Sequence, residues 1–167
     1  HKVCFPIAGR PAVNRLLDSL ERVGVGNHIV VVGDKWRQVA GGVSEVRDGV
    51  EFVYQMNQRG TGNAAKQAAY VLRAHGYAGN VLIVPGDKVF EEAAIERLLR
   101  TFRESDADAA LMVADKTFWP DSGRIVFDRS GRPVDIVEKR DIQKLILSAR
   151  ISQMVKACGS VSSRLIR

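Results

Sequence analysis

The sequence has few of the residues that hold small secreted or metal-binding proteins together. Its 167 residues include two cysteines and three histidines, and their spacing fits neither a disulfide framework nor a metal site. Its longest apolar run, Ala109 to Ala114, is far shorter than the roughly 18 residues of a membrane-spanning helix. We therefore expect a soluble protein of a reducing compartment, the cytoplasm, with no membrane partner.

Charge is unevenly spread along the chain. The formal net charge is +6, but seven of the 25 basic residues and only one of the 19 acidic residues lie between Lys139 and Arg167, so the preceding residues hold 18 of each sign. A balanced body gives no electrostatic footprint for nucleic acid, and we expect no nucleic-acid partner. Residues 142–167 are interpreted as a basic helical segment with no assigned role.

Apolar residues are plentiful and regularly placed. They make up 46% of the chain, enough for a continuous core. Strand-like and helix-like segments alternate, which predicts an α/β protein whose mainly parallel, twisted sheet has helices on both faces, in three layers, with a small antiparallel hairpin added. One helix is expected to open with Gly9-Arg10-Pro11, one to follow the glycine-rich stretch 60–62, and one to carry Glu91 and Glu92 in its first turn. Strands are expected at 29–32, 52–54, 81–84 and 109–113, and the hairpin at 124–127 and 134–137.

Three short stretches fall where such a fold binds ligands, beyond the carboxyl ends of its strands. The loop Gln55 to Gly62 follows one predicted strand, and Asp87 follows another. The turn around Gly123 precedes the predicted hairpin. We expect all three to lie on one rim of the sheet.

Asp87 has two possible roles. A carboxylate at the end of a buried strand is well placed to hold a hard cation such as Mg²⁺, which prefers oxygen ligands. The spacing alone also fits a turn residue or a helix cap.

The loop that begins at Gln55 has the chemistry to bind a nucleotide. A glutamine amide offers one donor and one acceptor, the pattern needed to read an imide such as uracil. Gly60, Thr61 and Gly62 lead into a helix N-terminus, whose free N–H groups favour acceptor atoms of a phosphate or base. A glycine turn with Thr61 as the N-cap explains the same residues without a ligand.

Lys2, Gly123 and Glu138 are weak candidates when taken singly. A surface lysine, a turn glycine and a solvated residue at a strand end account for them equally well. Their order and separation along the chain are more informative than each residue alone.

Taken together, the motifs resemble those of the sugar-1-phosphate nucleotidyltransferases, and within them the bacterial N-acetylglucosamine-1-phosphate uridyltransferase domain. The resemblance covers roughly residues 1–141, and an ordered set of motifs is more specific than any one of them. The motifs are Lys2-Val-Cys-Phe-Pro-Ile-Ala-Gly-Arg-Pro11, residues 55–64, Gly86-Asp87, Gly123-Arg-Ile125 and Ile136-Val-Glu138-Lys.

The resemblance implies a Rossmann-like nucleotidyltransferase fold, Mg²⁺ as cofactor, and a nucleoside triphosphate and a sugar-1-phosphate as substrates. By this resemblance Lys2 steadies substrate phosphates, and Asp87 is a catalytic, magnesium-binding carboxylate. Gln55, Gly60, Thr61 and Gly62 would contact the nucleotide, with uridine the preferred base, and Gly123 and Glu138 would hold the sugar.

The chain also departs from the family pattern. The family's first strand and glycine-rich loop, and the Asn-x-Asp motif with its second metal carboxylate, have no counterpart in the sequence. We therefore interpret residues 1–141 as a partial nucleotidyltransferase domain, incomplete at its N-terminus, and expect the chain as written to be inactive alone.

Two other functions remain open at this stage. A non-catalytic nucleotide-sugar sensor or partner subunit of the same fold would suit the missing second carboxylate and the unusual neighbours of Asp87. A dinucleotide-binding oxidoreductase is disfavoured, because no Gly-x-Gly-x-x-Gly follows the first strand-like segment.

Overall fold

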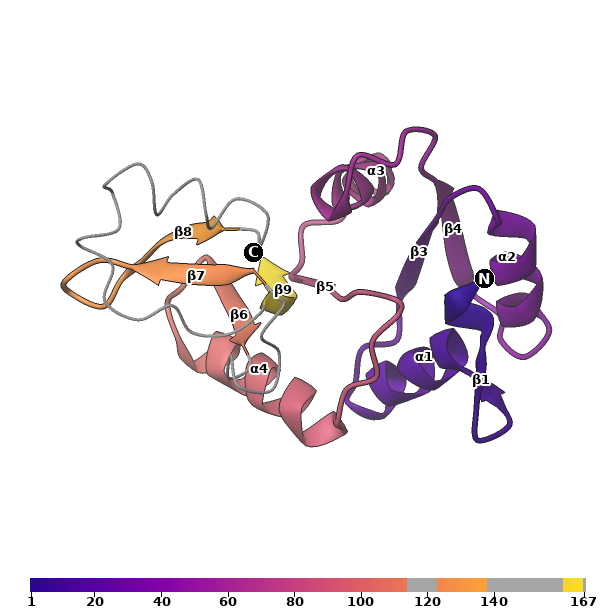
Figure 1. Cartoon of the computed structure of the whole chain (residues 1–167), viewed down its shortest axis with the longest axis horizontal. Coiled ribbons are helices and arrows are strands. Elements are labelled where there is room, and N and C mark those ends of the chain that lie inside the picture. Colours follow the sequence, from indigo (N-terminus) through magenta and orange to yellow (C-terminus); the bar gives the residue numbers. More distant parts are fainter. Residues whose placement is uncertain (114–122, 138–160, 167) are drawn as a thin grey trace.

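Helices and strands alternate along the chain in the computed structural model, which describes residues 1–113 and 123–137, and the backbone of residues 161–166 (Figure 1). None of the helices in these ranges is long and apolar enough to span a bilayer. The helices are η1 (Lys2–Cys4), α1 (Ala12–Arg22), α2 (Trp36–Ser44), α3 (Thr61–Ala74) and α4 (Glu92–Glu104). The strands are β1 (Pro6–Ile7), β2 (Arg10–Pro11), β3 (His28–Val32), β4 (Val50–Tyr54), β5 (Val81–Ile83), β6 (Ala109–Val113), β7 (Arg124–Phe127), β8 (Pro133–Val137) and β9 (Val161–Ile166).

Helical spacing of apolar residues explains α1 and α4. Leu16, Leu17 and Leu20 lie on one face of α1 and are all buried. The helix follows Pro11, a residue suited to helix starts, and is followed by Gly24, whose φ of 84° is readily adopted only by glycine. Both helices predicted from this spacing are therefore present.

Two buried clusters hold the described residues together. In the first, α1, α2 and η1 pack against the strand pair β3–β4. In the second, α1 and α4 pack together and against residues of β5 and β6. The buried members of the first are Val3, Val13, Leu17, Val32, Val39 and Val43, and those of the second are Leu16, Leu20, Ile95, Leu99 and Phe102.

The strand pair β3–β4 carries helices on both faces. The two strands are parallel, with His28 opposite Val50 and Val32 opposite Tyr54. Figure 1 shows α1 on one side of this pair and α3 on the other. The α/β character and the helix coverage predicted for this part of the chain are thus present.

The described sheets are short, and most of their pairs are antiparallel, unlike the mainly parallel sheet expected. β3–β4 is the parallel pair, whereas β1–β2, β5–β9, β6–β9 and β7–β8 are antiparallel within the described ranges. β5 and β6 run in the same direction, but β9 lies between them in the opposite direction. In this sheet the antiparallel pairing arises because β9, a strand late in the sequence, lies between β5 and β6.

Two elements depart from the sequence interpretation. Residues 161–166 form strand β9, so the helix expected for residues 142–167 is wrong for these six residues, and the rest of that segment lies outside the described ranges. Helix α2 was not predicted, and Trp36, its first residue, is 41% exposed.

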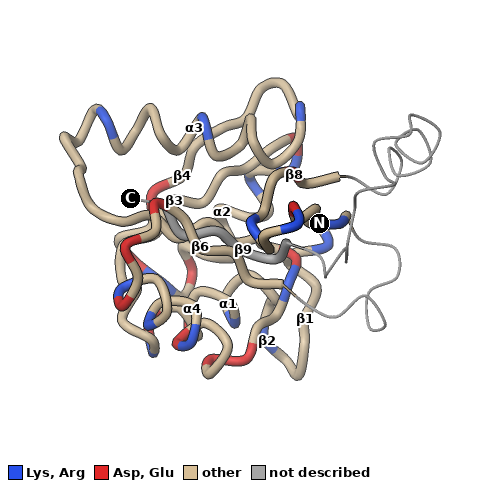
Figure 2. The backbone as a smooth tube through the Cα atoms, turned by 90° about the vertical axis from the view of Figure 1, so that its left-hand side faces the viewer, with Lys and Arg blue, Asp and Glu red and all other residues tan. Residues whose placement is uncertain are grey.

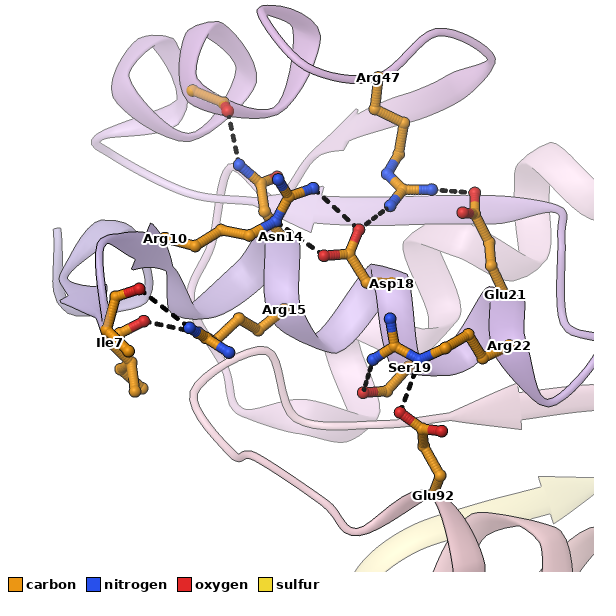
Figure 3. Close-up of polar contacts among 12 residues, drawn as sticks. Ile7, Arg10, Asn14, Arg15, Asp18, Ser19, Glu21, Arg22, Arg47 and Glu92 are labelled. Atoms are coloured by element: carbon orange, nitrogen blue, oxygen red, sulfur yellow. Dashed lines mark hydrogen bonds and ion pairs between the residues drawn. The ribbon is translucent and has the colours of Figure 1, made fainter.

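Ion pairs fasten α1 to its neighbours (Figure 3). Asp18 accepts from the guanidinium groups of Arg10 and Arg47, and Arg47 also pairs with Glu21. Asn14, which is buried, donates to the carbonyl of Gly42 at 2.8 Å. The Arg47 side chain is only 9% exposed, so these contacts fix the connection between α2 and β4 beside α1.

His28 makes the folded state sensitive to pH. It begins β3, is only 8% exposed, and its buried Nε2 has no hydrogen-bond partner in the described structure. Burial lowers its pKa below 6.5, partly opposed by a hydrogen bond with the backbone of Val25. Protonation therefore favours the unfolded chain, so His28 stabilises the fold above pH 6.5 and this contribution is lost as pH falls below that value.

We expect His28→Gln to weaken the dependence of the free energy of unfolding on pH between about 7.5 and 5.5. Urea denaturation at several pH values measures it. His75→Gln is the matched control, because the His75 side chain is 60% exposed. Equal pH slopes for the parent and His28→Gln would show that burial of this imidazole has no effect on stability.

Candidate active site

Lys2 and Asp87 meet although 85 residues separate them in the chain. Lys2 Nζ donates to Asp87 Oδ2 at 2.6 Å. Lys2 begins η1, and Asp87 follows the short strand β5 in the loop that leads to α4. Two residues predicted to act together are therefore in direct contact, on a surface where the Lys2 side chain remains 72% exposed.

The environment of Asp87 favours its ionised form. The hydrogen bond from Lys2 is the main cause of a pKa below the usual 3.8, and partial burial opposes it. The positive charges of Lys2 and Lys88 lower the pKa further. Asp87 is thus a carboxylate at neutral pH, with a lysine at hand to contact a second anion.

The carboxyl ends of three strands gather beside this ion pair. Val3, next to Lys2, lies in the same buried cluster as Val32, the last residue of β3. A Cβ added to Gly86 would meet the Val3 side chain at 3.9 Å, which places the end of the β5 loop against η1. The main-chain N–H of Gln55 in turn donates to the Val32 carbonyl at 2.8 Å. The loops after β3, β4 and β5 therefore share one edge, as expected for two of the three predicted stretches.

The Gln55 loop is held by its own side chains. Gln55 Nε2 donates to the Gly60 carbonyl at 3.2 Å and to Asn63 Oδ1 at 2.9 Å. Helix α3 begins at Thr61, so Gly60, with φ 89°, is the N-cap, and the alternative that placed Thr61 in that role is wrong. Thr61 and Gly62 occupy the exposed first turn.

The structure describes only one of the two predicted sugar-binding residues, Gly123. Gly123 directly precedes β7, and its carbonyl accepts from Arg124 Nη1 at 3.2 Å. No described contact joins Gly123 to Lys2, Asp87 or Gln55. Glu138 lies outside the described residues.

Asp87 offers a magnesium ion one carboxylate at this edge. The described residues contain no group of three or more His, Cys, Asp or Glu side chains able to hold a metal. Mg²⁺ is commonly bound by one or two carboxylates, with substrate phosphates and water supplying the other ligands. Asp87 fits that pattern of binding, since it is ionised and exposed at the edge, and a closed protein cage is not required.

Sequence reasoning overlooked Asn63 and the ion pairs of Asp18. Asn63 stands in the first turn of α3, and its side chain is the partner of Gln55. The signal available was its place directly after Gly60-Thr61-Gly62. Figure 2 shows Lys and Arg as well as Asp and Glu along the described backbone.

Sequence comparison places this chain among known proteins. Residues 1–163 match the family described as the MobA-like NTP transferase domain. The Bifunctional protein GlmU of Sphingopyxis alaskensis is 38% identical over 143 residues, covering 84% of this chain and 30% of that protein. The protein of the same name from Prochlorococcus marinus is 35% identical over 141 residues, covering 84% of this chain and 31% of its own length. The chain thus spans less than a third of these relatives.

Solved structures share the fold at lower sequence identity. HddC from Yersinia pseudotuberculosis has a TM-score of 0.66 and 18% identity, covering 99% of this chain and 66% of that one. The inositol-1-phosphate CTP transferase from T. maritima has a TM-score of 0.69 and 18% identity, covering 99% and 61%. A CMP:2-keto-3-deoxy-manno-octonic acid synthetase complexed with CTP has a TM-score of 0.66 and 17% identity, covering 99% and 67%.

Proposed function

This chain belongs to the MobA-like NTP transferase domain family, and on that premise we propose that it joins a nucleoside triphosphate, UTP, to a sugar-1-phosphate, giving a nucleotide sugar and pyrophosphate. N-acetylglucosamine-1-phosphate is the proposed sugar substrate. A phosphate oxygen of the sugar-1-phosphate attacks the α-phosphorus, a new P–O bond forms there, and the bond to the β-phosphate breaks. The protein positions the two substrates and neutralises their charge.

The contact between Lys2 and Asp87 is the observation that carries this proposal. It puts one cation and one anion at the edge where β3, β4 and β5 end. In the proposed reaction Asp87 would hold Mg²⁺, which neutralises phosphate charge when bound. Lys2 would move from Asp87 to a substrate phosphate, a change that its exposed side chain can make without disturbing the core.

The other proposed roles belong to residues of the loops. Gln55, Gly60, Thr61 and Gly62 would bind the nucleotide, and Gly123 and Glu138 the sugar. We assign these roles to residues 1–141, as an α/β nucleotidyltransferase domain. Residues 142–167 keep no proposed role beyond the pairing of β9.

One observation favours a second candidate, a nucleotide-sugar-binding partner that performs no chemistry. Asp87 is ion-paired with Lys2, and no cluster of further metal-ligating side chains accompanies it among the described residues. Such a protein would bind the nucleotide sugar at the same edge without turnover.

Pyrophosphate release tests the two candidates. The protein expressed from its complete reading frame is incubated with Mg²⁺, each of four nucleoside triphosphates and a panel of sugar-1-phosphates. We expect turnover with UTP and N-acetylglucosamine-1-phosphate. Saturable binding of UDP-N-acetylglucosamine without any turnover would support the binding partner instead. If the protein shows no binding and no turnover, both candidates are excluded.

A further inference from the structure

The carboxamide of Gln55 is held in one orientation. Its Nε2 donates to two acceptors, the Gly60 carbonyl at 3.2 Å and Asn63 Oδ1 at 2.9 Å. An amide nitrogen carries two hydrogens, so both are used within the loop. No other described residue hydrogen-bonds to the Gln55 side chain.

The Gly60 carbonyl acts together with Asn63 in fixing which end of the amide faces inward. It also accepts the main-chain N–H of Ala64 at 3.2 Å, and a carbonyl oxygen has no hydrogen to donate. A flipped Gln55 would point Oε1 at this oxygen, two acceptors face to face. Gly60 adopts φ 89° and ψ −179°, a backbone conformation essentially restricted to glycine. The backbone that presents the carbonyl is therefore specified by the sequence.

This arrangement leaves Gln55 with an acceptor to offer a ligand. The sequence suggested that its amide would read a base with a donor and an acceptor together. Here Nε2 is engaged inside the loop, so Oε1 is the atom free to contact a base. An acceptor is matched by the ring N3–H of uracil and opposed by the unprotonated ring N3 of cytosine.

We infer that Asn63 is a positioning residue that sets the base specificity of the proposed nucleotidyl transfer, on which this inference rests. By accepting from Gln55 Nε2, Asn63 turns Oε1 toward the base and favours uracil over cytosine. Asn63 acts through Gln55 and contacts no substrate. Two structural neighbours are named for CTP.

The test compares UTP with CTP, both in binding and in turnover, using the protein expressed from its complete reading frame. Dissociation constants come from isothermal titration calorimetry, and kcat and KM from pyrophosphate release. We expect Asn63→Ala to reduce the preference for UTP about 10-fold, by weakening UTP binding and raising its KM. Asn63→Asp should retain the preference, because a carboxylate oxygen also accepts from Nε2. Asn57→Ala is the matched control, since Asn57 is exposed in the same loop and its side chain has no described hydrogen bond.

Each outcome has a distinct meaning. The role of Asn63 is overturned if Asn63→Ala keeps the preference for UTP, or if Asn63→Asp and Asn57→Ala lose that preference as much as Asn63→Ala does. Either result leaves the proposed function in place. A parent protein that prefers CTP also overturns the inference, while nucleotidyl transfer stands. The absence of both nucleotide binding and turnover removes the proposed function itself.

Discussion

Replacing Asp87 by asparagine should lower kcat/KM for nucleotidyl transfer by about 100- to 1,000-fold. The amide keeps the size of the side chain but removes the negative charge proposed to hold Mg²⁺. In the parent, the Lys2 hydrogen bond keeps the pKa of Asp87 below 3.8, so the carboxylate is charged throughout the neutral range. Pyrophosphate release at saturating Mg²⁺, followed over both substrate concentrations, measures the loss.

The control for this variant is Asp48→Asn. Asp48 is exposed in the connection before β4, at the opposite end of that strand from Gln55, and it forms no described ion pair. We expect this change to leave kcat/KM and the thermal midpoint close to those of the parent. Full activity of Asp87→Asn would remove the carboxylate from the mechanism, whatever the role of its neighbours.

The second large effect concerns stability. Phe102 is 1% exposed and lies where α4 meets α1 and residues of β5 and β6. We expect Phe102→Ala to lower the free energy of unfolding by about 3–5 kcal/mol, because it removes buried apolar surface and leaves a cavity. Urea denaturation followed by circular dichroism gives this value from the shift in midpoint at constant slope.

Phe5→Ala provides the matched comparison, since the same atoms are removed from a side chain that is 72% exposed. Its effect should stay within about 0.5 kcal/mol. If both variants unfold at the same urea concentration, the packing of α4 contributes nothing to stability. A loss confined to Phe102→Ala locates the stabilising core between α1, α4 and the strands beneath them.

The sequence reveals those elements whose apolar spacing is determined locally. Leu16, Leu17 and Leu20 predict α1, and the β-branched run from Ile29 to Val32 predicts β3. Helix α2 has weaker signals, because Gly41 and Gly42 lower its intrinsic helix propensity. It is held by the burial of Val39 and Val43 against α1 and β4, a tertiary effect that no local pattern records.

In the candidate site, too, some features follow from local sequence and others depend on tertiary contacts. The rule that ligands bind beyond strand ends pointed to Asp87 and the Gln55 loop, and the structure brings both to one edge. Family resemblance pointed to Lys2, whose contact with Asp87 joins distant parts of the chain. The partnership of Asn63 with Gln55 depends on side-chain geometry across a turn, and spacing alone does not specify it.

The position of β9 has a consequence for the order of events on the ribosome. Within the described ranges, β5 is hydrogen-bonded only to β9, so the strand that leads to Asp87 emerges long before its partner is translated. Until Val161–Ile166 leave the exit tunnel, β5 and β6 present open edges to other nascent chains. We therefore expect chaperones to shield these edges during synthesis, until β9 pairs with β5 and β6.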